Sequence, residues 1–336
     1  MMNGLQRTLD FIDGKAVDLP PFHPILMRFA AKYAGVAYRD FCLRPECKTA
    51  AMIACARDFG LDWVTVLSDP YSEAEAFGLE VEYPEDSLPQ NTTPLIREIG
   101  DIDRLELPKF EASRRMLNRV REIELYRQAV GSEFFIVGWV EGALAEYVDL
   151  RGLTQTCMDL YDAPEPLERA LRLLNENAKA FITRQVEAGA HCIGIGDAAC
   201  SQIGPKFYRN YVWELEKELV EHIQALGCLA KVHICGNTSS FLADVIRTGA
   251  DIVDVDHLSG DMLPFVEHLQ PGQVLCGNSD PVSVVQDGTD AELVASVEAC
   301  HLQTQGRGIV SAGCEITPGT SVERFQAYAT AARALG

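Results

Sequence analysis

The chain has 336 residues, 47% of them hydrophobic, which is too apolar for a disordered protein and enough for a large core. Its 49 acidic and 29 basic side chains give a formal net charge of −20, so most of its surface would repel a phosphate backbone and nucleic acid is not an expected partner. No signal-peptide pattern opens the chain, and no stretch approaches the roughly 18 uncharged apolar residues of a membrane span, so we expect a cytoplasmic protein with no membrane partner.

Short apolar runs between turn residues recur along the chain and predict buried strands. In chain order these runs are Pro24–Met27, Trp63–Leu67, Phe134–Val140, Cys192–Gly196, Leu229–Ile234, Ile252–Val255, Val274–Cys276 and Gly308–Ser311. Most of them are continuously apolar rather than alternating, which is typical of strands covered on both faces of a parallel sheet.

Amphipathic stretches between these runs predict helices. The clearest are Pro164–Ala188, Pro205–Leu226, Ser239–Thr248 and Asp290–Gln305. Strands that alternate with helices at this spacing imply a parallel sheet with right-handed crossovers. Eight such strands predict an α/β fold, a single (β/α)8 TIM barrel with an N-terminal extension, formed by residues 1–336 as one domain.

Residues 71–127 do not follow this rhythm. They contain Pro84, Pro89 and Pro94 and then a charged helical pattern from Pro108 to Arg127. We therefore expect an insertion after the second strand that forms part of a rim or lid.

Two predicted strands end in side chains that bind metals. His233 and Cys235 are two residues apart at the end of one strand, so they point to the same side, and Cys314 follows the last strand. The strand ends of a TIM barrel face one mouth, where active sites lie. One imidazole and two thiolates suit Zn²⁺ and leave a fourth position open. Buried cysteines are also common packing residues, and the spacing alone leaves both interpretations open.

Several segments together are similar to those of a known superfamily. They are Met27–Tyr33, Leu67–Asp69, Gly196–Asp197, Pro205–Tyr208, His233–Asn237, Thr248–Asp251, Gly277–Pro281 and Gly313–Glu315. Over nearly its whole length the chain resembles the uroporphyrinogen decarboxylase superfamily, which also implies the barrel. One branch of that superfamily removes carboxylates from uroporphyrinogen without a metal. The other branch consists of zinc-dependent cobamide methyltransferases.

The methyltransferase branch has a His-x-Cys pattern and a distant Cys that bind catalytic zinc. This pattern falls on His233, Cys235 and Cys314. The resemblance implies methyl transfer between a corrinoid, carried on a separate corrinoid-binding protein, and a small acceptor or donor. A thiol, a folate, a methoxy compound and a methylamine all remain open, as does the direction of transfer.

The decarboxylase branch is matched less completely. Of the two arginines that bind substrate carboxylates there, Arg28 is present, but Lys32 replaces the second and cannot make the same bidentate contact. The catalytic aspartate of that branch corresponds to Asp69. A metal-free decarboxylase that uses Arg28 and Asp69 is therefore the alternative hypothesis. A non-catalytic barrel that binds a corrinoid protein or a metal is the third.

Acidic residues follow several predicted strands and could surround the same mouth. They are Glu141, Asp197, Asp256, Asp280 and Glu315. One of them could supply a fourth zinc ligand or orient His233, although such acids also cap helices. We take Glu141 and Asp197 as substrate-binding candidates together with Arg28 and Asp69. Asn237, the last candidate, is expected to order the loop after Cys235.

Overall fold

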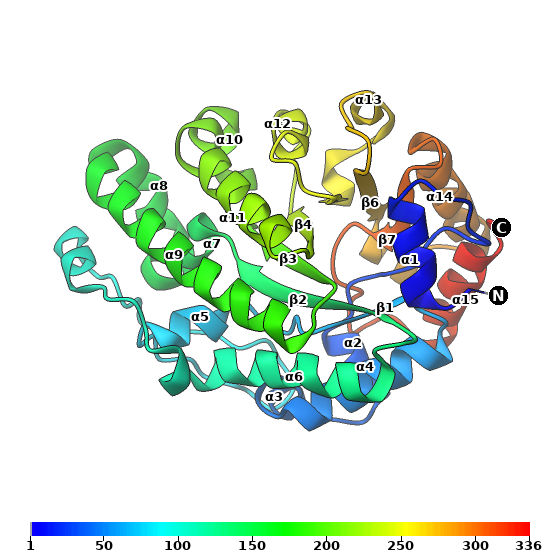
Figure 1. Cartoon of the computed structure of the whole chain (residues 1–336), viewed down its shortest axis with the longest axis horizontal. Helices are drawn as coiled ribbons and strands as arrows, with labels where there is room; N and C mark the ends of the chain where they lie inside the picture. Colours follow the sequence, from blue (N-terminus) through cyan, green and yellow to red (C-terminus); the bar gives the residue numbers. More distant parts are fainter. Residues whose placement is uncertain (1) are drawn as a thin grey trace.

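A curved sheet of parallel strands forms the centre of the molecule (Figure 1). The computed structural model describes residues 2–336. Seven strands lie side by side in chain order, each hydrogen-bonded to the next. They are β1 (Trp63–Thr65), β2 (Phe135–Glu141), β3 (Cys192–Gly196), β4 (Leu229–Ile234), β5 (Ile252–Val255), β6 (Val274–Ser279) and β7 (Gly308–Ala312).

The prediction of a first strand at Pro24–Met27 is wrong. The chain instead contacts the sheet slightly earlier, where Phe22 forms an isolated parallel bridge with Val310 of β7. The carbonyl of Phe22 also accepts a hydrogen bond from the backbone N–H of Asp62, just before β1. Because the three prolines within residues 20–24 have no N–H to donate, this segment cannot extend a regular ladder. It fills the gap between β7 and β1 as an irregular eighth element.

Helices surround the convex side of the sheet in Figure 1. The α-helices are α1 (Gly4–Ile12), α2 (Arg28–Tyr33), α3 (Tyr38–Leu43), α4 (Pro45–Asp58), α5 (Tyr71–Ala76), α6 (Arg114–Val130), α7 (Ala143–Arg151), α8 (Leu153–Asp162), α9 (Pro164–Ala188), α10 (Cys200–Phe207), α11 (Trp213–Ala225), α12 (Leu242–Ile246), α13 (Leu263–Val266), α14 (Asp290–Gln303) and α15 (Val322–Arg333). Short 3₁₀ or π turns are η1 (Ile99–Arg104), η2 (Phe110–Ala112), η3 (Tyr208–Val212), η4 (His257–Ser259) and η5 (Pro281–Gln286).

The predicted helices differ in how well their limits agree with the structure. The helix predicted at Pro164–Ala188 is α9, with proline in its first turn and Gly189 in the left-handed conformation just past its end. The helix predicted at Pro205–Leu226 is longer and interrupted. It begins in α10, where Gly204 has a positive φ of 71°, and continues through η3 into α11.

Helix α1 lies against the inner layer at the strand starts. Its apolar residues pack on a buried cluster from the beginnings of several strands, including Trp63 and Phe135. The indole N–H of Trp63 donates a hydrogen bond of 2.7 Å to the hydroxyl of Thr8 in α1. The N-terminal extension thus covers the end of the barrel opposite the strand C-termini.

Residues 71–127, predicted to form a rim insertion, contain two parts that lie in different places. Their C-terminal part is the first part of α6, which packs against α4 and α9 in the outer helical layer. An earlier part carries Leu88, which lines a cavity at the strand ends. We retain the rim role as a proposal for the residues around Leu88.

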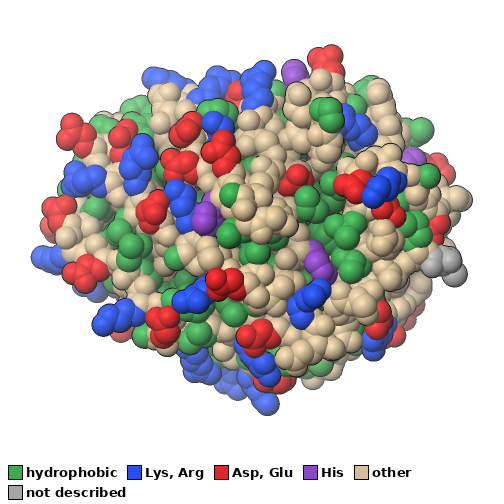
Figure 2. Space-filling model, in the orientation of Figure 1, with side chains coloured by type: hydrophobic (Ala, Val, Ile, Leu, Met, Phe, Trp, Pro, Cys, Tyr) green, Lys and Arg blue, Asp and Glu red, His purple; other side chains and the backbone are tan. Residues whose placement is uncertain are grey.

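The outer surface carries charges of both signs. Figure 2 shows acidic and basic side chains interspersed over one face, without the continuous basic area that a phosphate backbone requires. Among residues 2–336, none of the helices combines the length and the hydropathy needed to cross a bilayer.

Candidate metal centre

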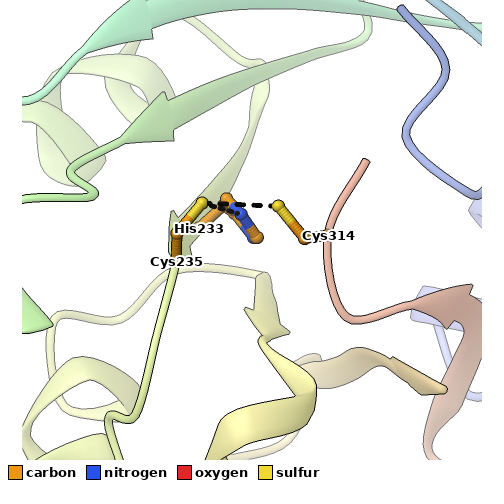
Figure 3. A group of neighbouring side chains, drawn as sticks. All are labelled: His233, Cys235 and Cys314. Carbon is orange, nitrogen blue, oxygen red and sulfur yellow. Dashed lines mark hydrogen bonds between the residues drawn. The ribbon is translucent and has the colours of Figure 1, made fainter. Parts of the chain in front are cut away.

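His233, Cys235 and Cys314 meet at the C-terminal ends of β4 and β7 (Figure 3). The Nε2 atom of His233 lies 3.1 Å from Sγ of Cys235. The two sulfur atoms, 79 positions apart in sequence, lie 3.6 Å from each other. All three ligand atoms fall within 4.8 Å of one another. Strand β4 holds His233 in the buried layer, while both thiols are partly accessible.

These separations fit the donor set of a tetrahedral zinc ion. With Zn–S near 2.3 Å and Zn–N near 2.05 Å, tetrahedral angles place neighbouring ligand atoms roughly 3.5–3.8 Å apart. The sulfur–sulfur distance of 3.6 Å falls in that range, and the His233–Cys235 distance of 3.1 Å needs only a small outward shift. Cys276 at the end of the apolar run Val274–Cys276 is buried in β6 and does not belong to this cluster.

A buried carboxylate supports the imidazole from behind. Asp254 of β5 is the register partner of His233, and its Oδ2 lies 3.3 Å from Nδ1 of His233. The same oxygen is 2.6 Å from Nζ of Lys231, and all three side chains are buried. The ring therefore presents Nε2 to the thiols and Nδ1 to a carboxylate, as zinc-binding histidines commonly do.

Sequence reasoning missed this supporting pair, although a signal was present. Asp254 interrupts the apolar run Ile252–Val255, and Lys231 precedes His233 by two positions, so both charges point into the barrel. A charged side chain in a fully buried strand requires a partner of opposite charge. Applying this rule to Lys231 and Asp254 would have predicted that they pair with each other.

The charges of this cluster favour binding of a divalent cation. Burial opposes a charged imidazole, but the carboxylate of Asp254 outweighs burial and raises the pKa of His233 to about 10. The hydrogen bond between the thiols lowers the pKa of Cys314 and raises that of Cys235. Without a metal, these shifts favour a protonated His233, a protonated Cys235 and the thiolate of Cys314, and a metal would displace the protons of the first two.

Two adjoining cavities open beside the thiols. The smaller, of about 210 Å³, is lined almost entirely by apolar atoms and includes His233, Cys235, Cys314 and Trp139. The larger, of about 560 Å³, extends from Cys235 toward α7. Both cavities border Glu141. A small molecule in the smaller cavity would lie against both cysteines, whereas one in the larger cavity would adjoin Cys235 alone.

The pattern that defines uroporphyrinogen decarboxylase (URO-D) proteins matches residues 3–335, nearly the entire chain. The chain belongs to the URO-D family. The fold agrees, because a methyltransferase from Methanosarcina mazei superposes with a TM-score of 0.88 at 22% identity, covering 99% of this chain and 98% of the other.

Curated relatives of this URO-D chain divide between two activities. A methylcobamide:CoM methyltransferase, MtaA of Methanosarcina barkeri, is 25% identical over 97% of this chain and 96% of its own length. A uroporphyrinogen decarboxylase of Thermodesulfovibrio yellowstonii is 24% identical over 86% and 84%. Because the identities are nearly equal, the activity has to be argued from the site.

The two residues that a URO-D decarboxylase would use already form ion pairs with other side chains of this chain. Arg28 forms an ion pair with Glu315, with Nη2 and Oε2 3.0 Å apart, and its backbone N–H donates to the same carboxylate. Asp69 is fully buried in an ion pair with Arg115 and accepts a hydrogen bond of 2.6 Å from Ser68. Asp69 and the Glu315 partner of Arg28 border the smaller cavity, whereas Arg28 itself does not line it, so this ion-paired arginine is not placed to bind a substrate carboxylate there.

The remaining predicted site residues lie in different surroundings. Glu141 ends β2 and lines both cavities, accepting a hydrogen bond of 2.9 Å from the indole of Trp139. Asp197 is buried behind the cavities, where it accepts a hydrogen bond of 2.8 Å from the backbone N–H of Ala145 in the first turn of α7. Asn237 is exposed, and its side chain accepts hydrogen bonds from Ser239, which orders the loop after Cys235.

Proposed function

We propose that this chain is a zinc-dependent methyltransferase, which moves a methyl group between a corrinoid on a partner protein and a small molecule. The observation that carries this proposal is the contact of His233, Cys235 and Cys314 at one mouth of the barrel. Two curated relatives named methylcobamide:CoM methyltransferases support it, with about 25% identity over most of the chain.

The residues of this chain would hold the metal and orient the small molecule. His233 and the two thiolates would hold zinc through three positions and leave a fourth open to a reactant, and the apolar cavity adjoins all three of these side chains. Bound zinc would act as a Lewis acid, lowering the pKa of a coordinated thiol or polarising a methylated heteroatom. Asp254 fixes the tautomer of His233, and the apolar wall around Trp139 limits access of water.

Methyl transfer at this site conserves electrons in either direction, because each bond that forms is matched by one that breaks. Toward the small molecule, a thiolate sulfur supplies the electron pair of the new S–C bond, while the pair of the Co–C bond stays on cobalt and reduces it from cobalt(III) to cobalt(I). In the reverse direction cobalt(I) supplies the electron pair of the new Co–C bond, and the heteroatom keeps the electron pair of the bond to the methyl group that breaks. No other oxidant or reductant is required.

The proposal is tested by metal content and local structure. We expect about one zinc per chain, and X-ray absorption at the zinc edge should give two sulfurs, one nitrogen and one lighter, exchangeable ligand. Methylcobalamin should donate its methyl group to a thiol only in the zinc-loaded protein. Carefully purified protein without zinc, or chelated protein that still decarboxylates uroporphyrinogen, would overturn the proposal.

Asp254 should act as a positioning residue for the zinc ligand His233. We expect Asp254→Asn to weaken zinc binding by about 10- to 100-fold, because the amide orients the imidazole poorly and lowers its basicity. Competition with a chromophoric chelator measures this affinity directly.

Lys231→Met is the matched control for Asp254→Asn. It breaks the same buried ion pair but keeps the contact between Asp254 and His233. We expect it to lower stability while leaving zinc affinity within about threefold of wild type. Equal losses of zinc affinity in the two variants would show that Asp254 contributes to stability only and does not position His233 for zinc.

A further inference from the structure

The two cavities beside the proposed metal centre are bordered by acidic side chains, without a lysine or arginine among the described residues that line them. Carboxylates border them at Asp69, Glu141, Asp149, Asp256 and Glu315. Across the described chain, no lysine or arginine lines either cavity. A zinc ion held by two thiolates and a neutral imidazole has no net charge, so the centre itself would not offset these acids.

Three of the five carboxylates have partners. Arg115 neutralises Asp69, and Arg28 neutralises Glu315. The third, Asp256, lies 3.0 Å from Nδ1 of His257 and accepts backbone hydrogen bonds. Glu141 and Asp149 remain, and they face the larger cavity together.

Buried Glu141 and half-buried Asp149 lie near two further buried acids, Glu73 and Glu146, and few cations accompany this group. Glu73 accepts a hydrogen bond of 3.0 Å from the backbone N–H of Glu141, and the nearest cation, Arg119, lies 3.8 Å from Glu73. Neither oxygen of buried Glu146 has a hydrogen-bond partner, and neither does Oδ2 of Asp149. Unpaired buried carboxylates are costly, and a cation in the adjoining cavity would relieve that cost.

The pKa shifts of Glu141 and Asp149 also favour a cation in the adjoining cavity. Burial first, and then repulsion from neighbouring carboxylates, raise the pKa of Glu141 well above its usual range. The same causes raise the pKa of Asp149. An incoming cation would favour their charged forms, whereas an anion would add to the repulsion.

We infer that the small molecule of this site is a cation, with its reactive heteroatom at the metal and an ammonium group toward Glu141 and Asp149. This inference rests on the proposed methyltransferase function and narrows its substrate class. An aminothiol offers one group to each part of the lining, a sulfur for the thiol cluster and an ammonium group for the carboxylates. A thiol with an anionic tail, such as coenzyme M, does not.

Three thiols with the same two-carbon chain test the inference. Cysteamine ends in an ammonium group, 2-mercaptoethanol in a neutral hydroxyl and 2-mercaptoethanesulfonate in an anion. Titration calorimetry on the zinc-loaded protein should show cysteamine binding about tenfold more tightly than 2-mercaptoethanol, as expected for one charge-assisted contact, and the sulfonate about tenfold more weakly.

Glu141→Gln separates the charge effect from the differing acidities of the three thiols. Thiol acidity acts equally in wild type and variant, so the change between the two proteins isolates the carboxylate. We expect the preference for cysteamine over 2-mercaptoethanol to shrink to about threefold or less, with zinc content unchanged. Asp149→Asn provides a second variant with the same expectation, and Glu267→Gln, an exposed acid on the outer surface, should change nothing.

The outcomes distinguish this inference from the function on which it rests. If none of the thiols binds the zinc-loaded protein, the methyltransferase proposal itself fails. If all three bind but the sulfonate binds as well as cysteamine, or Glu141→Gln leaves the preference intact, only the cationic substrate class is overturned.

Discussion

Replacing Cys314 with alanine is expected to weaken zinc binding by about a thousandfold. Apparent zinc-binding free energies of about 10–16 kcal/mol in four-ligand sites correspond to roughly 2.5–4 kcal/mol for each ligand, and the upper end of this range is close to a thousandfold change in affinity. The two ligands left on β4 would retain zinc poorly, so methyl transfer should fall at least in parallel. Inductively coupled plasma mass spectrometry of the dialysed variant, together with a methylcobalamin assay, measures both losses.

The matched control for Cys314→Ala is Cys157→Ala. Cys157 is also a partly accessible free thiol, but it lies in α8 outside the cluster. We expect this variant to keep one zinc and wild-type activity. Cys235→Ala should reproduce the defect of Cys314→Ala, because both sulfurs meet at the same point. Retention of a full zinc equivalent in either ligand variant would exclude these thiols as the metal site.

A second large effect is expected on stability, from the buried ion pair between α4 and α6. Nζ of Lys48 lies 3.0 Å from Oε2 of Glu122, and both side chains are fully buried. Lys48 also donates to Ser68, next to the cavity. Lys48→Met leaves an unpaired buried carboxylate and should lower the free energy of unfolding by about 3–5 kcal/mol. Urea denaturation followed by circular dichroism measures the change.

The double variant Lys48→Met with Glu122→Leu gives the control. Apolar residues of similar volume can replace a buried ion pair at little cost, so its free energy of unfolding should lie within about 2 kcal/mol of wild type. If the double variant is as unstable as Lys48→Met alone, the loss comes from packing or from the hydrogen bond to Ser68. The unpaired charge would then not be its cause.

The barrel could be predicted from sequence because its signals are local. A continuous apolar run such as Leu229–Ile234 is buried in the same way wherever it occurs, and the proline and glycine at the ends of α9 act on neighbouring residues only. The prediction at Pro24–Met27 was wrong because strand assignment depends on hydrogen bonds to a distant partner. Near these prolines, the chain instead contacts Val310 through Phe22.

The three side chains of the proposed metal centre were singled out for a related reason, and the family resemblance then favoured metal binding over packing. His233 and Cys235 share one side of a strand by simple alternation, and every strand end in a parallel barrel faces the same mouth. Cys314 could therefore be assigned to the cluster without knowledge of any side-chain contact. The structure then added the separations, and with them the direction in which each nitrogen of His233 points.

By itself, then, the sequence determined the order of most strands and helices, because these follow from periodicity along the chain, and together with a family resemblance it predicted the three side chains of the proposed metal centre. Only the tertiary structure decided which charges are neutralised. Arg28 meets Glu315 across 287 positions, whereas no lysine or arginine from residues 2–336 lines the cavities that Glu141 borders. Charge pairing depends on distances of a few ångströms between residues that are remote along the chain, and no local pattern encodes those distances.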